Sequence, residues 1–339
     1  MSEAPSVAAR PGSRNLVEVV LRLREAGVVV FLVVLGLAFG LATDRFLSVQ
    51  NLTTVASSAA ILAIAACAQA IVLITRNLDV SVGSMMGLVA YLTADWAATH
   101  PGITPVEVVA IPLMIGTVLG AINGLLVAYG RVPALIATLG TMSLYRGFTY
   151  IYAHGQEVTS SRLPPWMLSS VDARIGGLPI LILVSIAIVA VVAWLLHAYP
   201  FGRRLYAVGS NGVAAWFFGL RAERVVFFAY VACGFLCGIA GLLYAARVGT
   251  VTVVLANGWE MSSLASAVIG GVSVSGGSGT VVGAALGAVV LATIDNGLVL
   301  LRVPEFWRMF IQGAAIVAAV AVDALIAEAI RRSTGGRRR

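Results

Sequence analysis

Residues 55–75 read VASSAAILAIAACAQAIVLIT, a run of 21 positions without a charged side chain. A helix needs about 20 predominantly apolar residues to cross the hydrocarbon core of a bilayer. Comparable apolar runs recur along the rest of the chain. This stretch therefore predicts one of several membrane-spanning helices.

The composition of the whole chain agrees with that prediction. Hydrophobic residues make up 60% of the 339 residues, charged residues make up 11%, and the mean hydropathy is +0.97. A soluble domain carries about 25% charged residues, and the strands of a membrane β-barrel alternate in polarity instead of running apolar. The composition excludes a soluble enzyme, a disordered chain and a β-barrel. It predicts an all-α, polytopic integral membrane protein.

We predict about ten transmembrane helices. The eighth and ninth are rich in glycine and serine, so they can be broken or half-length helices. The predicted spans are residues 26–43, 55–75, 81–99, 106–128, 132–153, 178–198, 225–246, 259–275, 280–301 and 307–330.

The basic residues set the orientation. All 22 are arginine, and the absence of lysine excludes a Walker-type nucleotide site and a Schiff-base lysine. With the N-terminus inside, 15 arginines fall on the cytoplasmic side, six fall outside and Arg146 lies within a span. Arginine-rich loops are typically cytoplasmic, so we expect both termini inside and no nucleic-acid partner despite the net charge of +7. The predicted parts are a cytoplasmic arm (1–25), a transmembrane domain (26–330) containing a cytoplasmic loop (199–224), and a basic tail (331–339).

Two sequence patterns occur once in each half of the chain. NGL at 123–125 followed by RVP at 131–133 returns as NGL at 296–298 followed by RVP at 302–304. Asp79-x-Ser81 opens the third span as Glu260-x-Ser262 opens the eighth. The members of each pair fall on opposite sides of the membrane, which favours an inverted repeat of spans 2–5 and 7–10, a transporter arrangement. The alternative is a chance match in a glycine- and valine-rich chain.

Polar residues within the spans are candidates for a pathway or gate. Asp79, Ser81 and Ser84 lie between two apolar runs, where they either form a gate or cap the third span. The fifth span carries Thr138, Thr141 and Arg146. An arginine inside a span is costly and usually faces a cavity or a partner, although Arg146 can also snorkel towards the outer interface.

The loop 199–224 contains a short apolar segment outside the predicted spans. Ser210 or Asn211 can cap a helix that Gly219 ends. Such a helix would expose apolar side chains, which favours a partner groove over the membrane surface. Gly270–Gly279 predicts a tight turn or close helix packing instead of a phosphate loop, and Cys67, Cys233 and Cys237 predict packing residues instead of a metal site.

Several stretches together resemble the permeases of bacterial ABC importers for monosaccharides. They are LDVSVGS (78–84), PALIATLGTMSLYRG (133–147), FGRRLYAVGSN (201–211), GWEMSSLASAVIGGVSVSGGSG (258–279) and DNGLVLLRVP (295–304), followed by Val322-Asp323. The similarity is greatest to the autoinducer-2 branch, with rhamnose-type permeases close to it.

The resemblance implies a membrane permease that binds no cofactor or metal, while a partner subunit uses ATP. It implies a second permease subunit, as a homo- or heterodimer, two ATP-binding subunits and an external solute-binding protein. The implied ATPase-coupling residues are Gly202, Arg203, Arg204, Gly209, Asn211, Ala214, Ala215 and Gly219. The candidate pathway or gate residues are Asp79, Ser81, Ser84, Asn123, Thr138, Thr141, Arg146, Glu260, Ser262 and Asn296. The alternative is an ion-coupled secondary transporter that uses Asp79 and Asp95.

Overall fold

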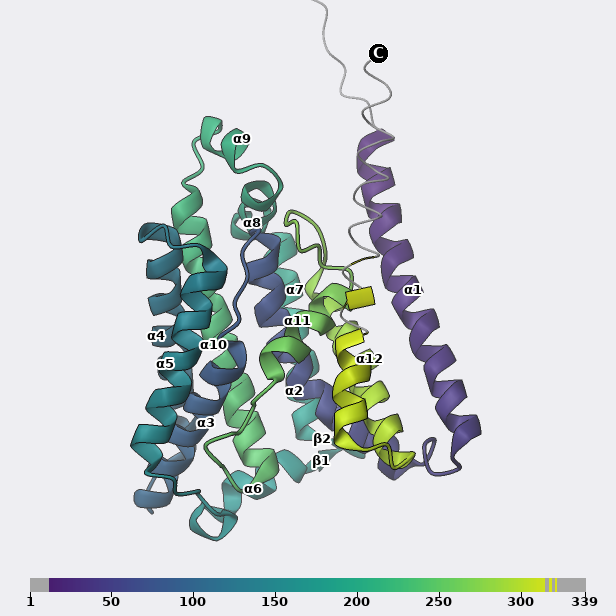
Figure 1. The fold of residues 1–339 in the computed structure, drawn as a ribbon, viewed down its shortest axis with the longest axis vertical. Helices are drawn as coiled ribbons and strands as arrows, with labels where there is room; N and C mark the ends of the chain where they lie inside the picture. Colours follow the sequence, from purple (N-terminus) through teal and green to yellow (C-terminus); the bar gives the residue numbers. More distant parts are fainter. Residues whose placement is uncertain (1–11, 315–316, 319–320, 322–339) are drawn as a thin grey trace, which may run out of the picture.

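The computed structural model describes residues 12–314, 317–318 and 321, and these residues form a bundle of helices (Figure 1). The basic tail, Val322-Asp323 and most of the tenth predicted span lie outside the described residues, as do residues 1–11 of the arm. The helices are α1 (Gly12–Ala42), α2 (Val49–Ile74), α3 (Val82–Thr99), α4 (Pro105–Gly124), α5 (Ala134–Ala153), α6 (Pro165–Asp172), α7 (Ile180–Ala198), α8 (Pro200–Ser210), α9 (Gly212–Phe217), α10 (Ala222–Val248), α11 (Trp259–Ile269) and α12 (Val281–Leu300).

Short elements complete the chain. A π-helical segment, Leu125–Tyr129, continues α4, a 3-10 turn spans Ser160–Arg162, and β1 (Arg174–Ile175) pairs antiparallel with β2 (Leu178–Pro179). The hairpin and α6 lie at one end of the bundle, while α8, α9 and the start of α1 lie at the other (Figure 1). The arginine distribution predicts that the α8–α9 end is cytoplasmic.

Six segments of the described chain are long and apolar enough to cross a membrane. They comprise α2, α7, α10, α12, α4 with its π-helical extension, and residues 25–42 of α1. The full-length α3 and α5 carry more polar residues and pack beside them. The six differ greatly in burial: the α2 window is 89% buried, whereas the α1 window is not buried at all. α1 therefore lies outside the bundle, against α12 (Figure 1).

The packing repeats between the two halves. α2 packs on α10 at the centre; α2 also contacts α11 and α12, while α10 contacts α3 and α4. The turns at the two RVP motifs match as well, because Arg131 (φ 55°) and Arg302 (φ 58°) both adopt the left-handed conformation. Few non-glycine residues adopt that conformation. The shared conformation and the exchanged contacts support the inverted repeat of spans 2–5 and 7–10.

The α4–α10 contact brings two backbones together. A Cβ at Gly120 would lie 2.9 Å from the Cα of Gly234, and a Cβ at Gly116 would lie 2.9 Å from the Cα of Gly238. Small residues permit this close approach in membranes, where van der Waals packing and hydrogen bonds drive helix association. The interface therefore has no room for larger side chains at these glycines, and α4 and α10 pack closely along it.

α3 and α11 are each preceded by a non-helical segment. Residues 251–258 lead into α11, whose 11 residues span only about 16 Å. The eighth predicted span is thus a half-length helix, as its composition allowed, whereas α12 shows the ninth to be continuous. The two helix starts touch: a Cβ at Gly83 of α3 would meet Glu260 and would lie 2.7 Å from the carbonyl oxygen of Ala256.

Candidate functional site

A buried polar cluster joins the segment before α3 to the end of α4. We call Asp79, Ser81, Asn123 and Tyr145 the inner cluster. The Ser81 hydroxyl and backbone N–H donate to Asp79 Oδ1 at 2.6 and 2.9 Å. The Asn123 amide donates to Ser81 Oγ at 2.7 Å and to Asp79 Oδ2 at 3.2 Å. Asp79, Ser81 and Asn123 are fully buried, so these bonds replace water around the carboxylate.

Neighbouring helices complete the inner cluster. The Tyr145 hydroxyl of α5 donates to Asn123 Oδ1 at 3.1 Å. Thr138 accepts from the backbone N–H of Val80 at 3.2 Å, and the Tyr230 hydroxyl of α10 donates to the carbonyl of Leu78 at 2.9 Å. The cluster therefore holds the extended segment between α4, α5 and α10.

The inner cluster corrects one expectation from the sequence. Ser81 precedes α3, but its side chain makes no capping hydrogen bond to the helix, and Asp79 accepts from Ser81 instead. Mutual bonding within the cluster has replaced the cap. Ser84 and Thr141 are also buried and bond to backbone carbonyls of Ser81 and Thr138. The first-half residues form a closed arrangement instead of lining an open channel.

Arg146 ties α5 to the segment before α11. Its guanidinium donates to the carbonyls of Leu255 at 2.9 Å and Val253 at 3.2 Å. Backbone carbonyls more than 100 positions away therefore bind Arg146, while a pathway role and snorkelling both stay predictions. Glu260 accepts from the backbone N–H of Gly258 through Oε1 at 3.2 Å. Its buried Oε2 finds no hydrogen-bond partner among the described residues.

The repeated acid-x-serine pattern does not occupy equivalent positions. Asp79 precedes α3, whereas Glu260 lies in the first turn of α11. The two asparagines of the NGL motifs also differ in surroundings. Asn123 is fully buried with several partners, whereas Asn296 is half-buried and accepts one bond from Asn51 at 2.9 Å. The halves share backbone turns but not polar packing.

An external cavity of about 720 Å³ lies between α2 of the first half and several helices of the second half. It lies between α2, the end of α10, the start of α11, α12 and residues 305–312. Its lining includes Trp259, Ser262, Asp295 and Arg308. Because α10 and α12 end at the external side in the predicted orientation, the cavity lies in the outer half of the bundle.

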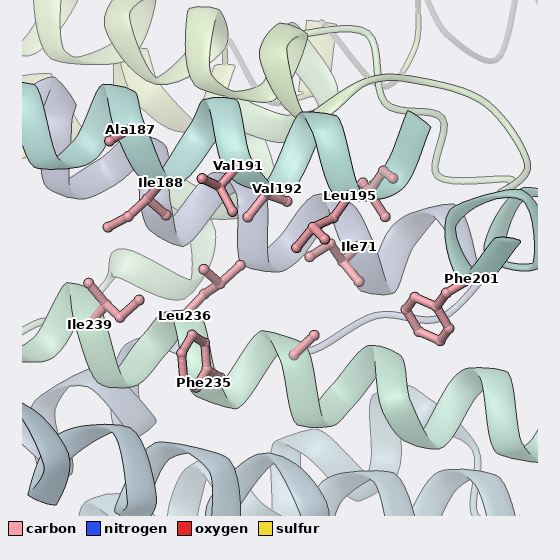
Figure 2. A pocket seen from close by; sticks show the side chains of 12 residues that line it. Ile71, Ala187, Ile188, Val191, Val192, Leu195, Phe201, Phe235, Leu236 and Ile239 are labelled. Atoms are coloured by element: carbon pink, nitrogen blue, oxygen red, sulfur yellow. The ribbon is translucent and has the colours of Figure 1, made fainter. Parts of the chain in front are cut away.

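A second cavity, of about 330 Å³, has a different character. It lies among α2, α7 and α10, with Phe201 of α8 at one end. Figure 2 shows that the side chains pointing into it, such as Ile188, Val192 and Leu236, are hydrocarbon. Such a lining suits an apolar occupant, so this cavity is a poor candidate for a hydroxyl-rich solute.

The end of the bundle that the sequence predicts to be cytoplasmic carries the exposed helix α9. Asn211 caps it by accepting from the Ala214 N–H at 3.0 Å, and Gly219 (φ 76°) follows it in a conformation that favours glycine. The helix lies where the sequence predicts it. Phe217 and Phe218 are 76% and 86% exposed, whereas Ala215 is buried beneath them.

α8, which the sequence analysis treats as loop, anchors α9 to the bundle. A Cβ at Gly209 would meet the carbonyl of Ile74 and lie 2.8 Å from the N of Gly277. A Cβ at Gly202 would overlap the carbonyl of Leu196. The backbones of α8, α7, α2 and the loop after α11 are thus in direct contact, while Arg203 and Arg204 are exposed.

The sequence profile of the family described as "Branched-chain amino acid transport system / permease component" matches residues 51–320. The chain belongs to this permease family. It is 37% identical over 310 residues to the autoinducer 2 import system permease protein LsrC of Escherichia coli (strain K12 / DH10B), covering 91% of this chain and 90% of that protein. It is 38% identical to LsrC of Salmonella paratyphi B, over 91% of this chain and 88% of the relative. No solved structure matched the chain.

Family membership and the helical bundle define the general role. The chain is a multi-pass transport subunit of the cytoplasmic membrane, of the type found in ABC importers for monosaccharide-like solutes. Two structural features of this permease were not predicted from the sequence: the bond from Tyr230 to the carbonyl of Leu78, and the convergence of Asp295 and Arg308 at the external cavity. An arginine and an acid near span ends were visible signals for the cavity, but their convergence depends on tertiary packing.

Proposed function

We propose that this permease moves a monosaccharide or sugar-like solute, of the autoinducer-2 or rhamnose/ribose type, by alternating access. ATP hydrolysis on a partner subunit drives the change. The observation that carries this proposal is the exposed apolar helix α9. Through α8, it is fixed to the end of α2 and to the loop after α11. The similarity to autoinducer 2 import permeases supports the solute class.

The surface of α9 supports docking of an ATP-binding subunit. Val213, Trp216, Phe217 and Phe218 are exposed together on one short segment. An exposed apolar patch of this kind marks an interaction site. A helix that inserts its apolar side chains into a groove is a common recognition mode. We infer that each permease offers one such helix to one ATP-binding subunit.

Contacts between α8, the end of α2 and the loop after α11 supply a route for the motion. The Tyr206 hydroxyl of α8 donates to the carbonyl of Gly279 in that loop at 2.9 Å. The Gly277 N–H of the same loop donates to the carbonyl of Ile74 in α2 at 2.9 Å. A Cβ at Gly276 would lie 2.6 Å from the Cβ of Arg76. Displacement of α8 therefore reaches the segment before α3 and the loop after α11 together.

The two halves support alternating access. The inner cluster closes the cytoplasmic half around Asp79, while the external cavity leaves the outer half open beside Ser262. Inverted repeats commonly exchange such open and closed arrangements during transport. In the opposite state, we expect the inner cluster to open and the external cavity to close.

The proposed assembly contains two permease subunits, two ATP-binding subunits and an external solute-binding protein. The chain has no lysine, so it lacks the residue that a Walker-type loop places on the phosphates. We infer that it binds no nucleotide, cofactor or metal, and that its partner uses the ATP.

The ion-coupled alternative has less support. Proton coupling through Asp79 would require opening the inner cluster, where Ser81 and Asn123 already donate hydrogen bonds to the carboxylate. Asp95 accepts from the Tyr152 hydroxyl at 2.9 Å near the other end of α3. No described hydrogen bond joins Asp79 to Asp95, so a relay between them has no visible route.

The test compares matched phenylalanine variants in membranes that contain the complete importer. Phe217→Ser with Phe218→Ser removes the exposed surface of α9, and Gly219→Trp disturbs its end. Phe306→Ser is the control because Phe306 is 66% exposed at the external end. Co-purification of the ATP-binding subunit and ATP-dependent uptake of D-ribose, L-rhamnose and autoinducer 2 are measured.

The α9 variants should lose the ATP-binding subunit and uptake, whereas Phe306→Ser should retain the ATP-binding subunit. All variants should reach wild-type levels in the membrane. Uptake that survives ATP depletion and stops with an ionophore would overturn the proposal in favour of ion coupling. Normal uptake by Gly219→Trp would contradict the role of α9.

A further inference from the structure

The external cavity has the dimensions of a small-molecule site. Its volume of about 720 Å³ lies within the range of about 300–1,000 Å³ that ligand pockets occupy. Part of its wall is the non-helical backbone at Asn257 and Gly258. Irregular backbone at membrane depth is tolerated where it is buried in protein or lines a water-filled cavity. The broken entry to α11 thus provides a polar wall.

The charges that line the cavity balance. Arg308 pairs with Asp295 at 3.1 Å and also contacts Glu305. The other cation, Arg247, donates to the Ser58 hydroxyl at 2.9 Å. Among the described residues that line the cavity, two arginines and two carboxylates give a formal charge of zero. This balance favours a neutral ligand with hydrogen-bonding groups over an anion or a cation.

Aromatic and polar groups occupy the same wall. The rings of Tyr244 and Trp259 lie 4.5 Å apart at an interplanar angle of 30°. Such side chains offer an apolar surface with a polar tip. Ser262 and Gln312 add donors and acceptors, and the buried Nε of Arg308 finds no hydrogen-bond partner among the described residues. The wall can contact both the carbon skeleton and the hydroxyls of a ligand.

We propose that this cavity, within a single permease subunit, is a binding site for a small neutral polyhydroxylated solute. The solute packs a C–H face on Trp259 and hydrogen-bonds the polar groups around Arg308. This inference rests on the proposed function, because it assigns the transported class of solute to a location outside the inner cluster.

Protection of an introduced thiol tests the site in the complete importer. Ser262→Cys places a thiol in the cavity, and Ser57→Cys places one in the neighbouring external groove that Arg174 helps to line. Both serines are half-buried, and the native Cys67, Cys233 and Cys237 are free but buried, which limits background reaction. The probe is the membrane-impermeant reagent MTSET, with D-ribose, L-rhamnose and autoinducer 2 as protecting ligands.

We expect MTSET to modify both variants from outside. A ligand at about ten times its Kd should slow modification of Ser262→Cys about tenfold, because the free fraction of sites falls with occupancy. It should not slow modification of Ser57→Cys. Trp259→Ala should weaken the protection, while Trp259→Phe, which keeps a ring, should preserve most of it. Thermal unfolding establishes that each variant is folded.

Three results would overturn the site. They are an unreactive Ser262→Cys in a folded protein, no protection by any of the three ligands up to about 100 mM, and equal protection of Ser57→Cys. Stronger protection by gluconate than by the neutral ligands would overturn the ligand class. Uptake without protection would support the proposed function and overturn this site. Protection without ATP-dependent uptake would support this site and overturn the proposed function.

Discussion

The inner cluster belongs to the first half of the permease, the external cavity is formed mainly by the second half, and the two contrast in their packing. In the first half, Asp79, Ser81 and Asn123 satisfy one another in a fully buried network. In the second half, Ser262 faces an open cavity, and Asn51 is the one side-chain partner of Asn296 among the described residues. Similar sequence patterns therefore support one closed and one open arrangement. The difference lies in which neighbouring helices reach the polar residues.

The largest expected effect comes from removing the carboxylate of the inner cluster. Asp79→Leu leaves the donors of Ser81 and Asn123 buried without their acceptor, at about 1–3 kcal/mol for each group. We expect a loss of about 3–5 kcal/mol of stability. Thermal or denaturant unfolding of the purified permease in detergent measures it.

Asp95→Leu provides the control for that variant, because Asp95 is half-buried and accepts one side-chain bond, from Tyr152. Its loss should be about 1 kcal/mol or less. Equal destabilisation by the two variants would show that the inner cluster is no tighter than an ordinary interfacial bond.

The two asparagines of the NGL motifs test the contrast directly. Asn123→Ala removes bonds to Asp79, Ser81 and Tyr145, and should cost about 2–3 kcal/mol. Asn296→Ala removes the bond to Asn51 and should cost about 1 kcal/mol. Unfolding measurements on both variants decide the order. A larger loss for Asn296→Ala would reverse our view of which half is closed.

The contact between the starts of α3 and α11 predicts that two glycine-to-alanine variants change stability in opposite directions. Gly83→Ala brings a methyl group against the carbonyl of Ala256, and should cost about 1–3 kcal/mol through overpacking. A Cβ at Gly147 of α5 would meet no described atom within 4 Å. Gly147→Ala should instead gain about 0.5–1 kcal/mol from helix propensity. Thermal unfolding of both variants and of wild type measures the two changes. Equal changes in stability for Gly83→Ala and Gly147→Ala would contradict the close contact at Gly83.

The smallest effect concerns the link from α8 to the second half. Burial raises the pKa of Tyr206 to about 12 from 10.0. The folded state thus favours the neutral phenol, so its contribution is complete below pH 10 and declines as the pH rises through 12. Tyr206→Phe should lose about 0.5–1.5 kcal/mol at pH 8.

The pH dependence separates this contribution from general alkaline unfolding. The difference in stability between wild type and Tyr206→Phe should shrink between pH 10 and 12. Tyr199→Phe is the control, since Tyr199 is half-exposed at the adjoining helix end. A difference that stays constant with pH would assign the loss to packing alone.

Local sequence signals predicted the permease fold well. Runs of apolar residues located most spans, and Asn211 with Gly219 located α9 because caps and positive-φ glycines act within a few residues. The matching turns at Arg131 and Arg302 support the repeat that short motifs suggested. The role predicted for each candidate site residue remains a prediction.

Long-range packing was not readable in the same way. The Arg146 partners lie 107 and 109 positions away in sequence, and the bond between Asn123 and Asp79 spans 44. Their polar types were visible, but their pairing depends on how α3, α5 and α11 cross. The helical state of α8 was also missed, because its amphipathic pattern is short and its first turn contains Pro200 and Gly202.

The glycine contact between α4 and α10 also constrains when the two helices can assemble during synthesis. About 98 residues separate the end of α4 at Gly124 from the start of α10 at Ala222. At about 5–20 residues per second, the glycine face of α4 remains uncovered for roughly 5–20 s. Lipid or the insertion machinery must shield that face until α10 emerges, so the final interface of the first half is completed only by the second half of the nascent chain.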